Sequence, residues 1–236
     1  MIKKDENFFV SSKQWLGIAV ASGLFCLIIR YRESGHLPMV NLFEITYFFA
    51  WTTSVLYFFV IKEKTPLFVG AAGLTAVNSL LVWTIFMDKN INPLNPLLDS
   101  FWLGIHVPAA MLSYGAFALS FGFSLYFIIA ARTKWKTGSI PELNSFLIRS
   151  GTILLGICIV TGAVWANTAW GTYWSWDPKE TWSLITFLIY GFSILLIKLF
   201  KIGHMWQAVL SVVGFLAVVF TFYGVSLILV SHHAYQ

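Results

Sequence analysis

Seven long apolar runs constrain the fold of this chain more than any other feature. They cover residues 14–31, 43–61, 66–87, 101–131, 145–166, 182–200 and 205–231. A helix needs about 20 residues to cross the ~30 Å hydrocarbon core of a bilayer. Runs of this length are too continuous for barrel strands, and helices satisfy their own backbone hydrogen bonds in lipid. The pattern predicts an all-α, polytopic integral membrane protein with about seven transmembrane helices, in one domain over residues 1–236.

Composition and the breaks between the runs agree with this prediction. Charged residues make up 11% of the chain, against about 25% in soluble domains. Pro38, Pro66, the NPLNP run at 92–96 and Pro141 all fall between apolar runs. No small-residue cleavage site follows the first run, so we expect it to be a retained membrane anchor.

The basic residues predict how the chain is oriented in the membrane. An N-terminus in the cytoplasm puts eleven of the fifteen Lys and Arg residues on the inner side: Lys3, Lys4, Lys13, Lys62, Lys64, Arg132, Lys134, Lys136, Arg149, Lys198 and Lys201. The outer side receives Arg30, Arg32, Lys89 and Lys179. Because cytoplasmic loops are enriched in Lys and Arg, we predict an N-terminus inside and a C-terminus outside. This sidedness explains the net charge of +5, and nothing in the sequence supports a nucleic-acid partner.

The predicted external face carries an unusual density of tryptophan. Five of the eleven tryptophans lie between residues 165 and 182, in the predicted external loop 165–182. One interpretation is an interfacial belt, since indole rings favour the membrane surface. A belt is normally spread over several helices, however, whereas these rings crowd one short segment. An aromatic shelf that binds a flat apolar ligand through Trp170, Trp174 and Trp176 is the second interpretation.

Histidines on the same predicted face favour the shelf. His106 lies just inside the outer end of the fourth run, and His233 follows the outer end of the seventh. Two imidazoles beside an aromatic shelf suit a bis-histidine haem. A zinc site is less well supported by the sequence, because no cysteine is near and three or four ligands are not evident. Spacing alone does not choose between His232 and His233.

Charged residues beside the tryptophans have two interpretations that hold together. Asp177, Pro178 and Glu180 form a helix N-terminus with a capping box. A helix N-terminus also attracts an anionic group such as a propionate, and Lys179 is a candidate partner for it. Asp177, a costly charge at the membrane surface, is predicted together with Lys179 to bind the cofactor. Glu44 is a further functional candidate, since charges inside a membrane are costly. Cys26 and Cys158 form no CxxC or CxxCH motif, so any redox chemistry requires a cofactor or another protein.

Four stretches resemble one known family. WANTAWGTYWSWDPKETWSLI, residues 165–185, is similar to the "WWD" signature of the CcsA/ResC proteins of system II cytochrome c maturation, in the haem-handling superfamily that includes CcmC and CcmF. ESGHLPMVNLFE at 33–44, PLLDSFWLGIHVPAAMLSYGAF at 96–117 and FYGVSLILVSHHAY at 222–235 resemble further segments of that family. The resemblance covers most of the chain from residue 30 onward.

The resemblance implies a function and a ligand set. It implies that His106 and His233 are axial ligands of the iron of haem b, and it selects His233 over His232 because Tyr235 stands two residues later. The implied function is to bind haem at the periplasmic face of the bacterial cytoplasmic membrane and present it to the CxxCH thiols of apocytochrome c. A ResB/CcsB-type membrane subunit is the implied partner in this haem lyase, and a thioredoxin-like thiol reductant acts indirectly. No general acid or base is expected.

Two other functions stay open on the sequence. A CcmC-type exporter or chaperone would pass haem to another carrier without forming the bond, and a haem b electron-transfer anchor would keep it. The anchor normally has histidine pairs across the membrane, whereas this chain offers ligands on one side. The family also usually has a histidine in the helix after the tryptophan motif, where this chain aligns Leu195. The absence of a histidine at this position argues against export of haem by this chain alone. The sequence predicts no role for His36 or His204.

Overall fold

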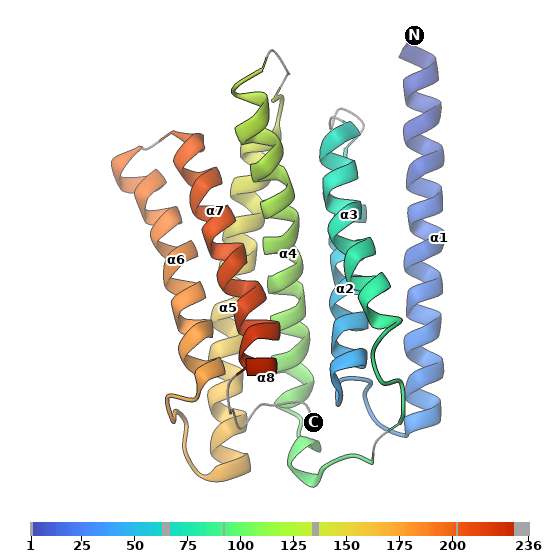
Figure 1. Cartoon of the computed structure of the whole chain (residues 1–236), viewed down its shortest axis with the longest axis vertical. Helices are drawn as coiled ribbons and strands as arrows, with labels where there is room; N and C mark the ends of the chain where they lie inside the picture. The colour runs from blue at the N-terminus through green and yellow to red at the C-terminus, as the bar shows by residue number, and fades with distance from the viewer. Residues whose placement is uncertain (1, 63–66, 92, 134–136, 202, 229–236) are drawn as a thin grey trace.

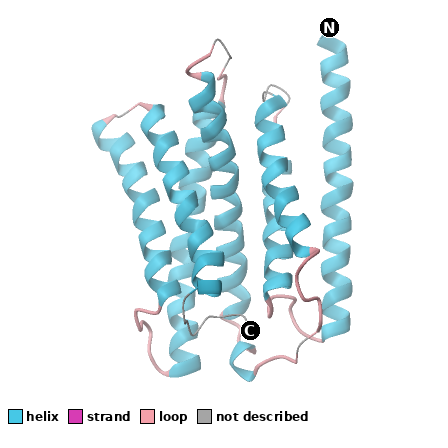
Figure 2. Cartoon of the chain, in the orientation of Figure 1, coloured by secondary structure: helices cyan, strands magenta, loops and turns pink. Residues whose placement is uncertain are grey.

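The computed structural model is a bundle of long helices. It describes residues 2–62, 67–91, 93–133, 137–201 and 203–228. Figures 1 and 2 show the helices running side by side, with short connections at the two ends of the bundle. The helical elements are α1 (Ile2–Ser34), α2 (Leu42–Val60), α3 (Leu67–Thr84), the short 3₁₀ turn η1 (Pro96–Leu98), α4 (Leu103–Ala130), α5 (Ile140–Trp170), α6 (Pro178–Phe200), α7 (His204–Val219), the π-helical turn η2 (Phe220–Gly224) and α8 (Val225–Ile228).

The predicted fold class is confirmed. Six helical segments of the described chain are long and apolar enough to cross a membrane: Phe9–Ser34, Leu42–Val60, Leu103–Ala130, Ile140–Trp170, Pro178–Phe200 and His204–Gly224. The run predicted at 66–87 forms α3, which has 18 residues. The chain is therefore a multi-pass, all-helical membrane protein, while the direction in which it crosses the bilayer remains a prediction.

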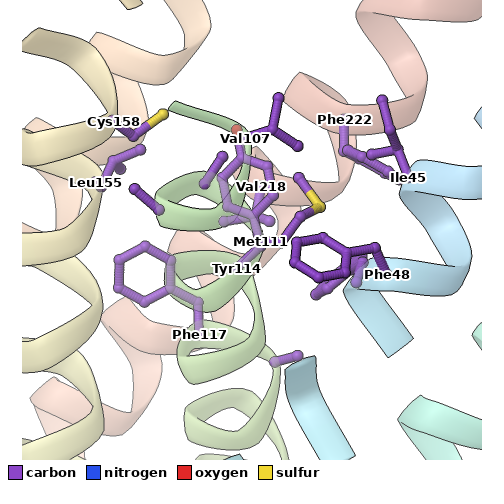
Figure 3. Packing of buried hydrophobic residues seen from close by; sticks show 14 of the residues in the cluster. Ile45, Phe48, Val107, Met111, Tyr114, Phe117, Leu155, Cys158, Val218 and Phe222 are labelled. Carbon is purple, nitrogen blue, oxygen red and sulfur yellow. The ribbon is translucent and has the colours of Figure 1, made fainter. Parts of the chain in front are cut away.

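The centre of the bundle is α4, which packs against α2, α3, α5 and α7. Small residues let these helices approach closely, as membrane interfaces favour. Gly151 of α5 is one: a side chain there would lie 2.7 Å from the ring of Phe117. That ring stacks on Tyr190 of α6 with centroids 3.6 Å apart, and both rings are fully buried. Figure 3 shows the apolar core to which Phe117 belongs, where it lies near Leu155 of α5 among other buried side chains.

Buried polar side chains also join the helices. The Ser120 hydroxyl donates to Asn144 Oδ1 at 2.6 Å and lies 2.7 Å from the Ser211 hydroxyl. Asn144 Nδ2 donates to Ser124 Oγ at 2.9 Å. All four side chains are buried, and mutual hydrogen bonds offset the cost of taking them out of water. They fix α4, α5 and α7 against one another.

One end of the bundle carries every predicted site residue that the structure describes. The loop 171–177, the loop 35–41 and the connection 85–102 all lie at this end, at the bottom of Figure 1, and the N-terminus of α1 lies at the other. We call it the tryptophan end. The common placement of these segments agrees with the alternation predicted from the apolar runs.

Candidate functional site

A cavity of about 80 Å³ opens at the tryptophan end between α4, α5, α6 and η2. Its lining combines an imidazole, indole and phenol rings, an ammonium and a carboxylate with apolar side chains from α4 and η2: His106, Tyr173, Trp174, Lys179, Glu180, Met111, Tyr114 and Phe222. Three of the residues predicted to bind a cofactor, His106, Trp174 and Lys179, therefore share one cavity although they come from three segments of the chain.

His106 lies in the first turn of α4 and is held by α5. Its Nδ1 atom is 2.8 Å from the carbonyl oxygen of Cys158. A carbonyl oxygen only accepts, so Nδ1 carries the hydrogen and Nε2 carries the lone pair. The ring of Trp165 stacks over the imidazole, with centroids 6.2 Å apart and planes 21° apart. The side chain thus has a defined orientation and a nitrogen that is chemically able to ligate a metal.

Trp165 and Trp170 belong to α5, which continues to Trp170, so the loop itself spans residues 171–177. The Trp165 indole N–H donates to the carbonyl of Leu97 at 3.0 Å and so ties η1 to α5. Trp170 packs edge-on against Trp165, with centroids 4.9 Å apart. Trp165 is buried, and Trp170 does not line the cavity. Trp165 therefore packs against His106 and Trp170 packs against Trp165, outside the cavity lining.

Trp174 and Trp176 lie in the loop and differ in environment. Trp174 lines the cavity, whereas Trp176 is 69% exposed. The two rings meet edge to face at 5.7 Å. Gly171, with φ of 79°, ends α5 in the left-handed conformation that glycine adopts without steric cost. The loop presents one ring to the cavity and one to its surroundings.

The predicted capping box at the start of α6 is present. Asp177 accepts a hydrogen bond from the backbone N–H of Lys179 at 2.9 Å, and Glu180 accepts from the backbone N–H of Asp177 at 3.2 Å and of Ser175 at 2.8 Å. Asp177 is buried and lies outside the cavity lining. Its described contacts are those of a helix cap, while Lys179 in the same turn lines the cavity.

The remaining histidines are dispersed. His36 lines a separate cavity of about 300 Å³ at the tryptophan end, together with Asp99 and Leu103. His204 begins α7 at the opposite end and is exposed. His232 and His233 lie outside the described residues, which reach Ile228 at the tryptophan end.

Leu195 and Glu44 do not line the cavity. Leu195 is 50% exposed on α6, on an apolar surface that it shares with Leu188 and Phe192. Glu44 is buried and ion-paired with Arg30 at 2.8 Å. That pairing accounts for a carboxylate in a membrane helix without a catalytic role.

Sequence reasoning missed the part of α5 that faces His106. Cys158 and Gly162 line the cavity, and Trp165 follows one turn later. The spacing of four and then three residues puts all three on one helix face. The sequence therefore predicts that these three residues share a face. Only the packing of α5 on α4 shows that this is the face in contact with His106. Figure 3 shows Cys158 of α5 beside Val107 of α4 in this region.

The donors at this site suit haem better than a protein-held metal cluster. Among the described residues no group of three or more His, Cys, Asp and Glu side chains could hold a metal ion. One imidazole with its lone pair on Nε2, flat aromatic faces and a cation match the iron, the ring and the carboxylates of a haem.

Comparison with known proteins identifies the family. An all-helical, multi-pass bundle with a tryptophan loop over a histidine defines the class, and the family model for cytochrome C assembly proteins matches residues 39–233. The chain belongs to this family, and its relatives include CcsA proteins. The cytochrome c biogenesis protein CcsA of Chlamydomonas reinhardtii is 36% identical over 93% of this chain and 67% of its own length. CcsA of Synechococcus sp. (strain CC9605) is 31% identical over 92% and 84%, and CcsA of Mesostigma viride is 33% identical over 93% and 85%.

Proposed function

We propose that this chain binds haem at the tryptophan end and presents it for covalent attachment to apocytochrome c. Membership of the CcsA family supports a role in cytochrome c biogenesis. The observation that carries the haem assignment is the shared cavity of His106, Trp174 and Lys179, with the imidazole lone pair on Nε2.

The size of the cavity bears on how haem is held. About 80 Å³ is far below the ~300–1,000 Å³ of clefts that enclose drug-sized ligands. A haem would therefore not fit inside the cavity, and His106 would hold its iron while the residues of the loop 171–177 would pack against the macrocycle. Trp174 packs on the porphyrin, the exposed Trp176 forms its approach surface, and Trp170 supports the shelf through Trp165. The Lys179 ammonium binds a propionate, a charge-assisted contact.

His233 is the proposed second axial ligand. The chain reaches the tryptophan end at α8, shortly before this residue, and η2 contributes Thr221 and Phe222 to the cavity. During transfer the histidine of the incoming CxxCH displaces one of the two ligands. Each cysteine S–H then adds across a vinyl C=C bond: sulfur bonds to one carbon and the proton ends on the other. The protein contributes mainly positioning to this step.

A partner and a location complete the proposal. A ResB/CcsB-type membrane subunit joins the chain in the haem lyase, and a thioredoxin-like reductant keeps the apocytochrome thiols reduced. The distribution of Lys and Arg supports a tryptophan end on the periplasmic side of the bacterial cytoplasmic membrane.

Haem spectra of variants test the site. The chain is purified with its partner subunit, and wild type is compared with His106→Ala, His233→Ala and the control His204→Ala, whose side chain is exposed at the other end. We expect both site variants to lose the six-coordinate signal and to regain it with added imidazole, while the control keeps it. An unchanged signal in both site variants would overturn the assignment.

A second experiment separates a lyase from a CcmC-type carrier. The chain and its partner are produced with an apocytochrome c reporter, and covalently bound haem is detected after denaturation. Covalent haem that depends on His106 supports the lyase. Haem bound by the chain but never linked to the reporter supports the carrier.

A further inference from the structure

Three features of α5 hold the imidazole of His106. The carbonyl of Cys158 accepts its Nδ1–H at 2.8 Å, the Trp165 ring stacks over it, and Gly162 lies against it. A side chain on Gly162 would place its first carbon 2.7 Å from both Nδ1 and Cε1. Such a contact is too short to exist, so the ring occupies the space that glycine leaves.

Gly162 explains how an imidazole reaches a carbonyl inside a helix. Residue 162 is one turn beyond residue 158, and the side chain of that next turn normally covers the carbonyl. Glycine leaves the oxygen open, and a carbonyl has a second lone pair besides the one used within the helix. Thr161 Oγ1 also approaches this oxygen, at 3.2 Å. The backbone of α5 is thereby an acceptor for the ring of a neighbouring helix.

We infer that Gly162 and the Cys158 carbonyl are the positioning device for His106: they hold the ring in one orientation and keep hydrogen on Nδ1, so that Nε2 is the ligating atom. The link to iron rests on the proposed function, whereas orientation and tautomer do not. In metal proteins, loss of such a partner of a ligating histidine typically weakens metal binding about 10–100-fold.

Nitrogen NMR of the haem-free chain tests the tautomer directly. The chain is labelled with ¹⁵N-histidine, and the His106 signals are assigned by their absence in His106→Gln. We expect a protonated Nδ1 in wild type and in the control Gly191→Ala, whose added carbon meets nothing within 4 Å. We expect Gly162→Ala to lose that signature. A proton on Nε2 in wild type would overturn the inference, and that measurement needs no substitution of Gly162.

Haem binding supplies the second readout. We expect Gly162→Ala to weaken haem binding about 10–100-fold and to recover with imidazole, and Gly191→Ala to match wild type. If His106→Ala loses the haem signal but Gly162→Ala changes neither tautomer nor affinity, the inference fails and the proposed function stands. If Gly162→Ala changes the tautomer but His106→Ala leaves haem binding intact, the proposed function fails and the positioning of the ring stands.

Discussion

We predict that the buried ion pair between Arg30 and Glu44 stabilises the packing of the first helix on the rest of the bundle. Glu44 Oε1 accepts from Arg30 Nε at 2.8 Å, and Oε2 accepts from the backbone N–H of Val40 at 2.9 Å. The two remaining guanidinium nitrogens of Arg30 donate to the carbonyls of Lys89 and Asn90. One guanidinium thus joins α1, α2 and the connection between α3 and α4.

Burial sets the size of the effect. The Glu44 side chain is 1% exposed and the Arg30 side chain 16%. Removing one partner of a buried pair costs about 3–5 kcal/mol, because the other charge is left without compensation. Arg30 keeps its two carbonyl acceptors, so we expect Glu44→Gln to lower the free energy of unfolding by about 3 kcal/mol, at the low end of that range. The double variant Arg30→Met/Glu44→Gln leaves no buried charge and should recover about 2 kcal/mol relative to the sum of the single variants.

The assay is a double-mutant cycle on detergent-solubilised protein, with unfolding followed by tryptophan fluorescence. Lys89→Met is the matched control: it removes a cation at the same place but keeps the backbone carbonyl that Arg30 uses. We expect it to stay within about 0.5 kcal/mol of wild type. The reasoning would be refuted if the effects of the two single variants on the free energy of unfolding simply added up in the double variant. It would also be refuted if Glu44→Gln were as stable as Lys89→Met.

Substitutions of Lys179, Asp177 and Gly151, each compared with a control variant, have defined outcomes. Lys179→Met should weaken haem binding in a titration by about tenfold or more, since a charge-assisted hydrogen bond contributes about 1.5–3 kcal/mol, and Lys179→Arg should retain most of it. Asp177→Ala should lower the free energy of unfolding by about 1 kcal/mol through loss of the helix cap, and Asp177→Asn by less. Gly151→Ala should destabilise by about 1–3 kcal/mol because its new carbon meets the stacked ring of Phe117, whereas Gly191→Ala should not; thermal unfolding of the three proteins decides.

Hydropathy predicted the helices well because lipid restricts the options, but it missed their ends. The first run was predicted at 14–31, and the helix is Ile2–Ser34, since polar residues outside the hydrocarbon can continue a helix without a hydropathy signal. The fifth was predicted at 145–166 and is Ile140–Trp170. Pro141 stands in its first turn, where proline is tolerated, and Gly171 supplies the stop.

The site was predictable in its parts and not in its assembly. The distribution of charges and the apolar runs predicted that His106, Trp174 and Lys179 lie at one end of the bundle. The rotation of α6 about its axis was not predictable by assuming that the apolar face is buried, because its buried residues are Thr186, Tyr190 and Ser193 whereas large apolar side chains of the same helix are exposed. For that reason only the structure shows that Leu195 is exposed on the outside of the bundle while Lys179, on the same helix, lines the cavity.

The segment Trp-Asp-Pro-Lys-Glu divides structural and binding roles between neighbours. Asp177 and Glu180 use their carboxylates on backbone N–H groups, so neither is fully available to a ligand. Pro178 holds the first turn of α6 in a helical conformation, and Trp176 accepts a φ of 58° at the tight turn. These contacts fix the turn from which Lys179 extends into the cavity. The two acids therefore build the start of the helix, and Lys179 supplies the positive charge that the proposed function assigns to a propionate, although Glu180 lines the same cavity.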